Sequence, residues 1–103
     1  MKLGQLVSDL HDAAAEITVT GFAIDHRKIA PGTIFGAFRG AAFNGEDFIE
    51  EAVAAGAIAI VARPEAHVSG ALHIVDDVPR RAFARLAAKF FRPFPQHIAA
   101  VTG

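Results

Sequence analysis

The hydrophobic positions along the chain alternate between helical spacing and the short apolar runs of buried strands. Apolar side chains that recur every three or four residues predict a helix with one buried face. Three helices are predicted in this way: one from residue 3 that ends in the Ala13–Ala15 stretch, one over residues 47–55 and one over residues 79–92. Gly56 is a natural stop for the second helix, and Pro79 suits the first turn of the third, which Asp76 or Asp77 can cap.

Short segments rich in apolar and β-branched residues lie between these helices and predict strands. There are five: residues 17–24, 34–38, 57–61, 72–75 and 98–101. Pro31 and Gly32 predict a turn, and Gly21 marks a bulge or a close approach within its strand. The pattern predicts an α/β fold. Its single small sheet has about five strands, mostly parallel in the second half, flanked by about three helices.

Composition narrows the class of protein. Hydrophobic residues make up 52% of the 103 residues and charged residues 20%, which suits one packed domain. The net charge of −1 gives no basic excess, so we expect no nucleic-acid partner. The chain has no cysteine and its five histidines lack ligand spacing, so we expect no metal site. It shows no secretory signal and no apolar run of roughly 20 residues, which predicts a cytoplasmic protein without a membrane partner.

Two loops follow predicted strand ends, where α/β proteins bind their ligands. In residues 25–28, Arg27 can grip a diphosphate or carboxylate, or Asp25 can cap an ordinary solvated turn. In residues 40–47, free N–H groups can bind an anion, and Phe43 can stack on a flat ring or lie in the core. The residues alone leave these alternatives open.

The remaining polar residues do not indicate catalysis. Arg81, Arg85 and Lys89 form one solvated helix face, and neither a nucleophile elbow nor a dinucleotide fingerprint occurs. The chain closes on Val101-Thr102-Gly103, which is either the opening of a phosphate-binding loop or a strand that ends at the surface. We therefore expect a binding domain with no catalytic residue.

Three segments together resemble a known family. They are Asp-His-Arg-Lys-Ile-Ala-Pro-Gly-Thr-Ile-Phe-Gly-Ala-Phe-Arg-Gly (25–40), Asn-Gly-Glu-Asp-Phe-Ile (44–49) with Ala52 and Gly56-Ala57, and Ala-Val-Thr-Gly (100–103). Their order and spacing are similar to those of the N-terminal domain of the Mur ligases, over nearly the whole chain. That family carries Asp-Ser-Arg-x-x-x-Pro-Gly-x-Leu-Phe-x-Ala-x-x-Gly, then Asp-Gly-x-x-Phe, then a helix and Gly-Ala. The short lead-in most resembles the branch that adds a diamino acid.

The resemblance implies that residues 1–103 form a UDP-sugar-binding domain cut at the start of the ATP-binding central domain. Thr102 and Gly103 would open the ATP loop, while ATP and Mg²⁺ would act in the full-length ligase and not bind this fragment. The implied partners are UDP-N-acetylmuramoyl dipeptide and the ligase's own central and C-terminal domains, in peptidoglycan synthesis. The implied contacts to the nucleotide sugar are Ile24, His26, Arg27, Ala41, Ala42, Phe43 and Asn44.

The chain departs from the family pattern in both loops. His26 replaces the family's Ser, and Asn44-Gly45 replaces Asp-Gly. Ala41 and Ala42 replace commonly polar side chains, so contacts there would come from the backbone. The D-alanyl-D-alanine-adding branch, a stand-alone α/β interaction module and an unrelated mononucleotide-binding fragment are the alternatives.

Overall fold

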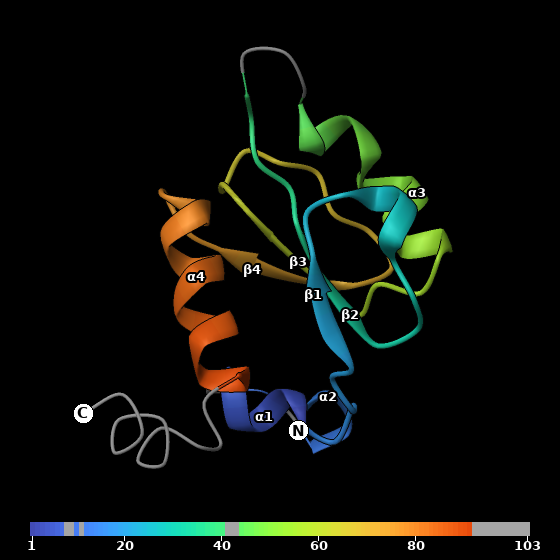
Figure 1. The fold of residues 1–103 in the computed structure, drawn as a ribbon, viewed down its shortest axis with the longest axis vertical. Coiled ribbons are helices and arrows are strands. Elements are labelled where there is room, and N and C mark those ends of the chain that lie inside the picture. Colours follow the sequence, from blue (N-terminus) through green and yellow to red (C-terminus); the bar gives the residue numbers. More distant parts are fainter. Residues whose placement is uncertain (8–9, 11, 41–43, 92–103) are drawn as a thin grey trace, which may run out of the picture.

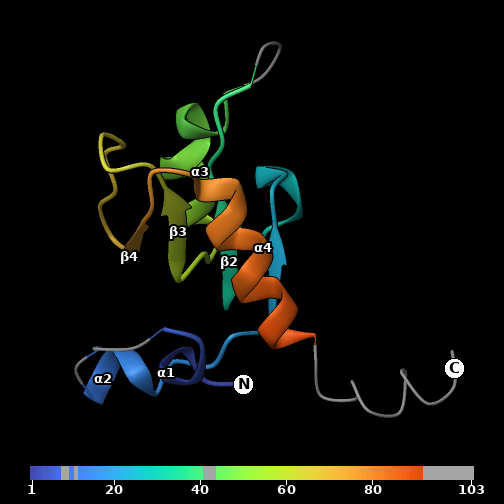
Figure 2. The same cartoon turned by 90° about the vertical axis from the view of Figure 1, so that its left-hand side faces the viewer.

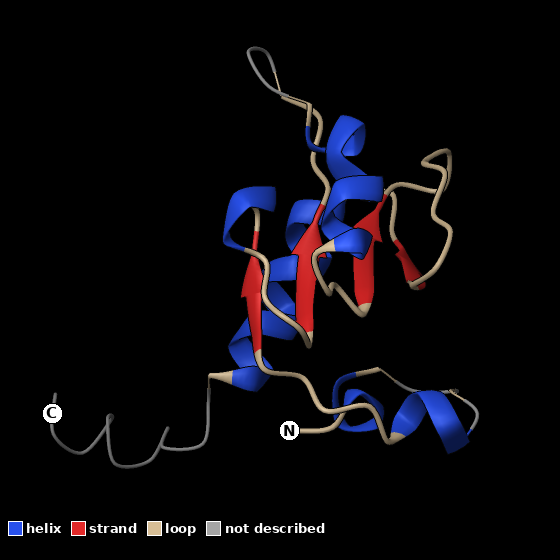
Figure 3. Cartoon of the chain, turned by 90° about the vertical axis from the view of Figure 1, so that its right-hand side faces the viewer, coloured by secondary structure: helices blue, strands red, loops and turns tan. Residues whose placement is uncertain are grey.

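A parallel β-sheet forms the centre of the domain (Figures 1 and 3). The computed structural model describes residues 1–7, 10, 12–40 and 44–91. Within them, the four strands lie side by side in chain order, and each neighbouring pair is parallel. The strands are β1 (Gly21–Ala23), β2 (Thr33–Gly36), β3 (Ala59–Ala62) and β4 (Leu72–Val75).

Helices cover both faces of this sheet. The twelve-residue α4 (Pro79–Phe90) crosses one face, and the shorter α3 (Ile49–Ala54) covers the other (Figures 1 and 2). Two one-turn helices, α1 (Leu3–Leu6) and α2 (Asp12–Ala15), lie near the edge from which the strands start. Two 3₁₀ turns, η1 (His26–Lys28) and η2 (Gly45–Phe48), follow β1 and precede α3.

Alternating side chains of the central strands divide the core in two. Ile34 is fully buried against α1 and α4, whereas the next residue, Phe35, is fully buried on the α3 side. Ile60 and Val61 divide between the faces in the same way. Each fully buried side chain of this size stabilises the fold by about 1.5–3 kcal/mol. The expected α/β class is therefore confirmed.

Turn residues end the elements where the sequence predicts. Gly56 follows α3 with a φ of 117°, and Gly32 turns into β2 with a φ of 93°. Pro79 occupies the first turn of α4, but neither Asp76 nor Asp77 caps that helix. The Asp76 carboxylate instead accepts a hydrogen bond of 2.7 Å from the N–H of Val78, the residue just before the helix begins.

Two expectations near the N-terminus are wrong. The first helix stops at Leu6, and Val7 is already extended. Only Gly21–Ala23 of the predicted strand 17–24 joins the sheet, because residues 17–19 pair with residues 1–3 instead, with Thr18 bridged antiparallel to Lys2. Gly21 pairs in regular register, with no atom within 4 Å of an added Cβ, so it marks no close approach. The predicted strand 98–101 lies outside the described residues.

Candidate groove at the carboxyl edge of the sheet

All four strands end at the same edge, because they are parallel, and a groove of about 690 Å³ opens there. Side chains and backbone from the ends of β1 and β2 and from the start of α4 form its walls. They are Ile24, Asp25, His26, Arg27, Gly36, Phe38, Gly40, Gly45 and Arg80. Ligands of open α/β sheets bind outside the carboxyl ends of the strands, so the groove is the candidate site.

Asp25 organises the first loop of the groove. Its carboxylate accepts a 3.0 Å hydrogen bond from the Arg27 backbone N–H and two more from the Arg27 guanidinium, at 3.0 and 2.9 Å. These hydrogen bonds lower the pKa of Asp25 to about 2, and those from the guanidinium have the largest effect. The capping role left open by the sequence is therefore observed. Arg27 lines the groove, but its guanidinium is already paired.

His26 packs inward from the same turn. Its ring stacks on Phe48 with centroids 4.1 Å apart, and its Nε2 lies 3.9 Å from the Glu51 carboxylate. The other ring nitrogen, Nδ1, is buried and has no hydrogen-bond partner among the described residues. His26 thus joins the first loop to η2 and α3, and exposes only 21% of its side chain.

The second loop reaches the groove through the glycines on either side of it. Gly40 and Gly45 line the wall, and Asn44 forms an antiparallel bridge with Arg39. The Gly45 N–H donates to the Phe38 carbonyl at 2.7 Å, and a Cβ on Gly45 would come within 2.8 Å of the Phe38 nitrogen. Only glycine fits this crossing.

Only some of the residues predicted to contact a nucleotide sugar line this groove. Ile24, His26 and Arg27 share one groove with the two flanking glycines. Asn44 lies next to the groove, where its Oδ1 accepts a bond of 3.0 Å from the Glu46 N–H. Ala41, Ala42 and Phe43, as well as Thr102 and Gly103, fall outside the described residues.

The sequence patterns assigned no binding role to Gly36, Phe38 or Arg80, which also line the groove. Phe38 and Arg80 line the large groove and also a second hollow of about 240 Å³ beside it. The Arg80 guanidinium carbon lies 4.8 Å from the centre of the Phe38 ring, and Phe38 meets Phe83 edge to face. The sequence feature that could have indicated Arg80 is its position, a few residues after a predicted strand and in the first turn of a predicted helix.

An ion pair fixes the wall of the second hollow. Arg63, at the end of β3, donates to the Glu46 carboxylate through Nε at 2.6 Å and Nη2 at 3.2 Å. The carboxylate raises the pKa of Arg63 above its usual value. Both side chains are mostly buried, so this bidentate pair ties η2 to the sheet.

The described residues restrict the chemistry. They contain no group of three or more His, Asp or Glu side chains that could hold a metal ion. None of the helices in this part of the chain is long and apolar enough to cross a membrane. The groove is concave and is lined by an aromatic ring and by guanidinium groups, which suit the binding of a flat, anionic molecule.

Sequence comparison identifies the class of protein. Residues 18–91 match the Mur ligase family, catalytic domain, and the chain belongs to this family. The resemblance read from the sequence is therefore confirmed.

The similar proteins include UDP-N-acetylmuramoyl-L-alanyl-D-glutamate–2,6-diaminopimelate ligases from several bacteria. That of Zymomonas mobilis is 58% identical over 99% of this chain, and that of Bradyrhizobium diazoefficiens is 43% identical over all of it. The ligase of Geobacillus kaustophilus is 41% identical over 82% of the chain. The chain spans about a fifth of the length of these curated relatives: 21%, 22% and 18%.

Proposed function

We propose that this chain is the N-terminal, UDP-sugar-holding domain of a ligase that adds a diamino acid to UDP-N-acetylmuramoyl-L-alanyl-D-glutamate. The names of the relatives support the substrate, with 2,6-diaminopimelate as the diamino acid. One structural observation carries the proposal: the groove at the carboxyl edge is lined both by Ile24–Arg27 and by the glycines that flank residues 41–43. These are the two loops on which the family resemblance rests.

In this proposal the domain contributes binding rather than chemistry. ATP phosphorylates the D-glutamyl carboxylate, and the amine of the diamino acid then attacks the acyl phosphate and releases inorganic phosphate. Both steps occur on polypeptide beyond this chain. A grip on the uridine end, remote from the reacting carboxylate, fixes the substrate so that the carboxylate meets ATP in the correct position.

The nucleotide chemistry of the whole ligase is proposed to take place in the domain that follows residues 1–103. Thr102 and Gly103 are proposed as the first residues of the ATP loop, with residues 1–103 as the preceding domain. ATP and its Mg²⁺ would be held by the next domain of the full-length ligase. A reaction that consumes ATP and a nucleotide sugar suits the cytoplasm, which we propose as its location.

An NMR titration tests the assignment. The isotope-labelled 103-residue chain is titrated with UDP-N-acetylmuramoyl-L-alanyl-D-glutamate and, separately, with ATP. We expect the first compound to shift the amide signals of Ile24, Gly40 and Gly45, and ATP to leave them unchanged. An absent response to the UDP compound, or shifts confined to the Arg81–Lys89 face of α4, would contradict the proposal.

A further inference from the structure

We propose that Arg80 is the residue of this domain that binds the diphosphate of the nucleotide sugar. This inference rests on the proposed function and adds a specific role for a residue to which neither the sequence motifs nor the comparisons assign one. It follows from the way charges are paired around the groove, from the position of Arg80 between two hollows and from the contrast with its neighbour Arg81.

The other basic side chains of the large groove already face carboxylates. The Arg27 guanidinium is held by both oxygens of Asp25, and the His26 ring lies 3.9 Å from Glu51. Arg80 has no carboxylate within ion-pair distance among the described residues. Its charge is therefore the one in this wall that a ligand anion can neutralise without breaking an existing ion pair.

The contact that Arg80 does make leaves its donors available. The guanidinium lies over the ring of Phe38, with its central carbon 4.8 Å from the ring centre. An aromatic ring accepts no strong in-plane hydrogen bond, so the N–H groups at the edge of the guanidinium can reach phosphate oxygens. The ring meanwhile limits the orientations of the side chain, which reduces the entropy lost on binding.

The position of Arg80 also favours an anion. Arg80 is exposed and lines both the groove of about 690 Å³ and the hollow of about 240 Å³. It follows Pro79 in the first turn of α4, where the helix carries partial positive charge. A diphosphate at this junction would leave the larger groove for the nucleoside.

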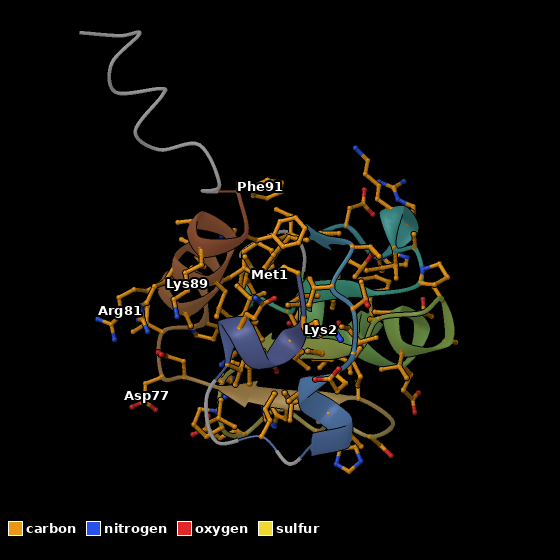
Figure 4. The ribbon with its side chains drawn as sticks, turned by 90° about the horizontal axis from the view of Figure 1, so that it is seen from below. Met1, Lys2, Asp77, Arg81, Lys89 and Phe91 are labelled. Carbon is orange, nitrogen blue, oxygen red and sulfur yellow. The ribbon has the colours of Figure 1, made fainter. Side chains whose placement is uncertain are left out.

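Arg81 supplies a matched control. It is the next residue on the same helix, it lies 3.8 Å from Asp76, and it lines neither hollow. Figure 4 shows its side chain projecting away from the rest of the fold. Removing Arg81 changes the net charge as much as removing Arg80 and leaves the groove wall intact.

The test measures the affinities of UDP and uridine for the 103-residue chain by NMR titration, in wild type, Arg80→Ala, Arg80→Lys and Arg81→Ala. We expect Arg80→Ala to weaken UDP binding at least tenfold and uridine binding less than twofold. The Lys variant should fall between, because it keeps the charge and loses the forked geometry. Arg81→Ala should bind both compounds within twofold of wild type.

The outcomes separate the two proposals. If wild type binds UDP and Arg80→Ala binds it equally well, or loses UDP and uridine to the same extent, the role of Arg80 is refuted and the proposed function stands. If wild type binds neither UDP nor UDP-N-acetylmuramoyl-L-alanyl-D-glutamate, both proposals fall. Thermal unfolding of each variant shows whether the fold is intact.

Discussion

The ring of His26 lies flat against the ring of Phe48, with an angle of 5° between the planes and 4.1 Å between the centroids. His26 belongs to the loop after β1, and Phe48 ends the turn that leads into α3. Their contact joins two loops that are more than twenty positions apart in the sequence. The shape of the groove therefore depends on packing beneath it as well as on the residues of its wall.

The stacked ring of His26 is expected to matter for packing more than its nitrogens do. His26→Ala removes a stacked pair and should lower the free energy of unfolding by about 0.5–1.5 kcal/mol. His26→Phe keeps a ring and removes Nδ1, which has no hydrogen-bond partner in the described part of the chain, so it should stay within about 0.5 kcal/mol of wild type. Urea unfolding measures both. A Phe variant less stable than the Ala variant would show that the imidazole nitrogens are needed.

The pairing of Asp25 with Arg27 predicts a pH dependence in acid. The pKa of Asp25 is lowered to about 2 from 3.8, so its contribution to stability is complete above pH 4 and is lost as the pH falls through about 2. Arg27→Gln removes the guanidinium, which is the largest cause, and retains the backbone N–H. The pKa of Asp25 should then move back toward 3.8. Carboxyl ¹³C titration measures it, and equal values in wild type and Arg27→Gln would refute the assignment.

Gly56 is expected to tolerate no side chain. Its φ is 117°, and an added Cβ would lie 2.7 Å from the Cα of Pro31, which is backbone and cannot move aside cheaply. Gly56→Ala should cost about 1–3 kcal/mol of stability. Gly21→Ala is the control, because nothing lies within 4 Å of its added Cβ. Denaturation of the two variants should differ clearly, and equal midpoints would contradict the backbone assignment.

Gly36 keeps the aromatic wall of the groove in place. A Cβ there would lie 2.6 Å from Cζ of Phe38 and 2.8 Å from Cδ1 of Phe83. Gly36→Ala should displace both rings, cost about 1–3 kcal/mol and weaken UDP binding. Unfolding and UDP titration measure the two effects. Wild-type UDP affinity in a variant with shifted Phe38 signals would show that this ring is not part of the site.

Local signals predicted much of the fold. The strand Leu72–Val75 lies where its apolar run predicts, and Gly56 and Pro79 take the turn and first-turn positions expected of them. These features depend on backbone conformations that single residues favour. The predicted strand 17–24 was too long because Thr18 pairs with Lys2, a contact between distant residues that no local pattern records.

The candidate site was predictable in its loops but not in its charges. Strand ends placed Ile24–Arg27 at the carboxyl edge, as expected for parallel strands. The same local pattern could not decide between a free and a paired Arg27, because that depends on the conformation of one turn. The sequence could not place Arg80 in the groove, because its position over Phe38 depends on the packing of α4, which is a tertiary contact.

A crystal structure of the 103-residue chain grown with UDP-N-acetylmuramoyl-L-alanyl-D-glutamate tests the central claim most directly. The account predicts density for the uridine diphosphate in the groove between Ile24–Arg27 and Gly45, with a phosphate oxygen within hydrogen-bond distance of Arg80. Density for the nucleotide at any other surface, with this groove empty, would contradict it.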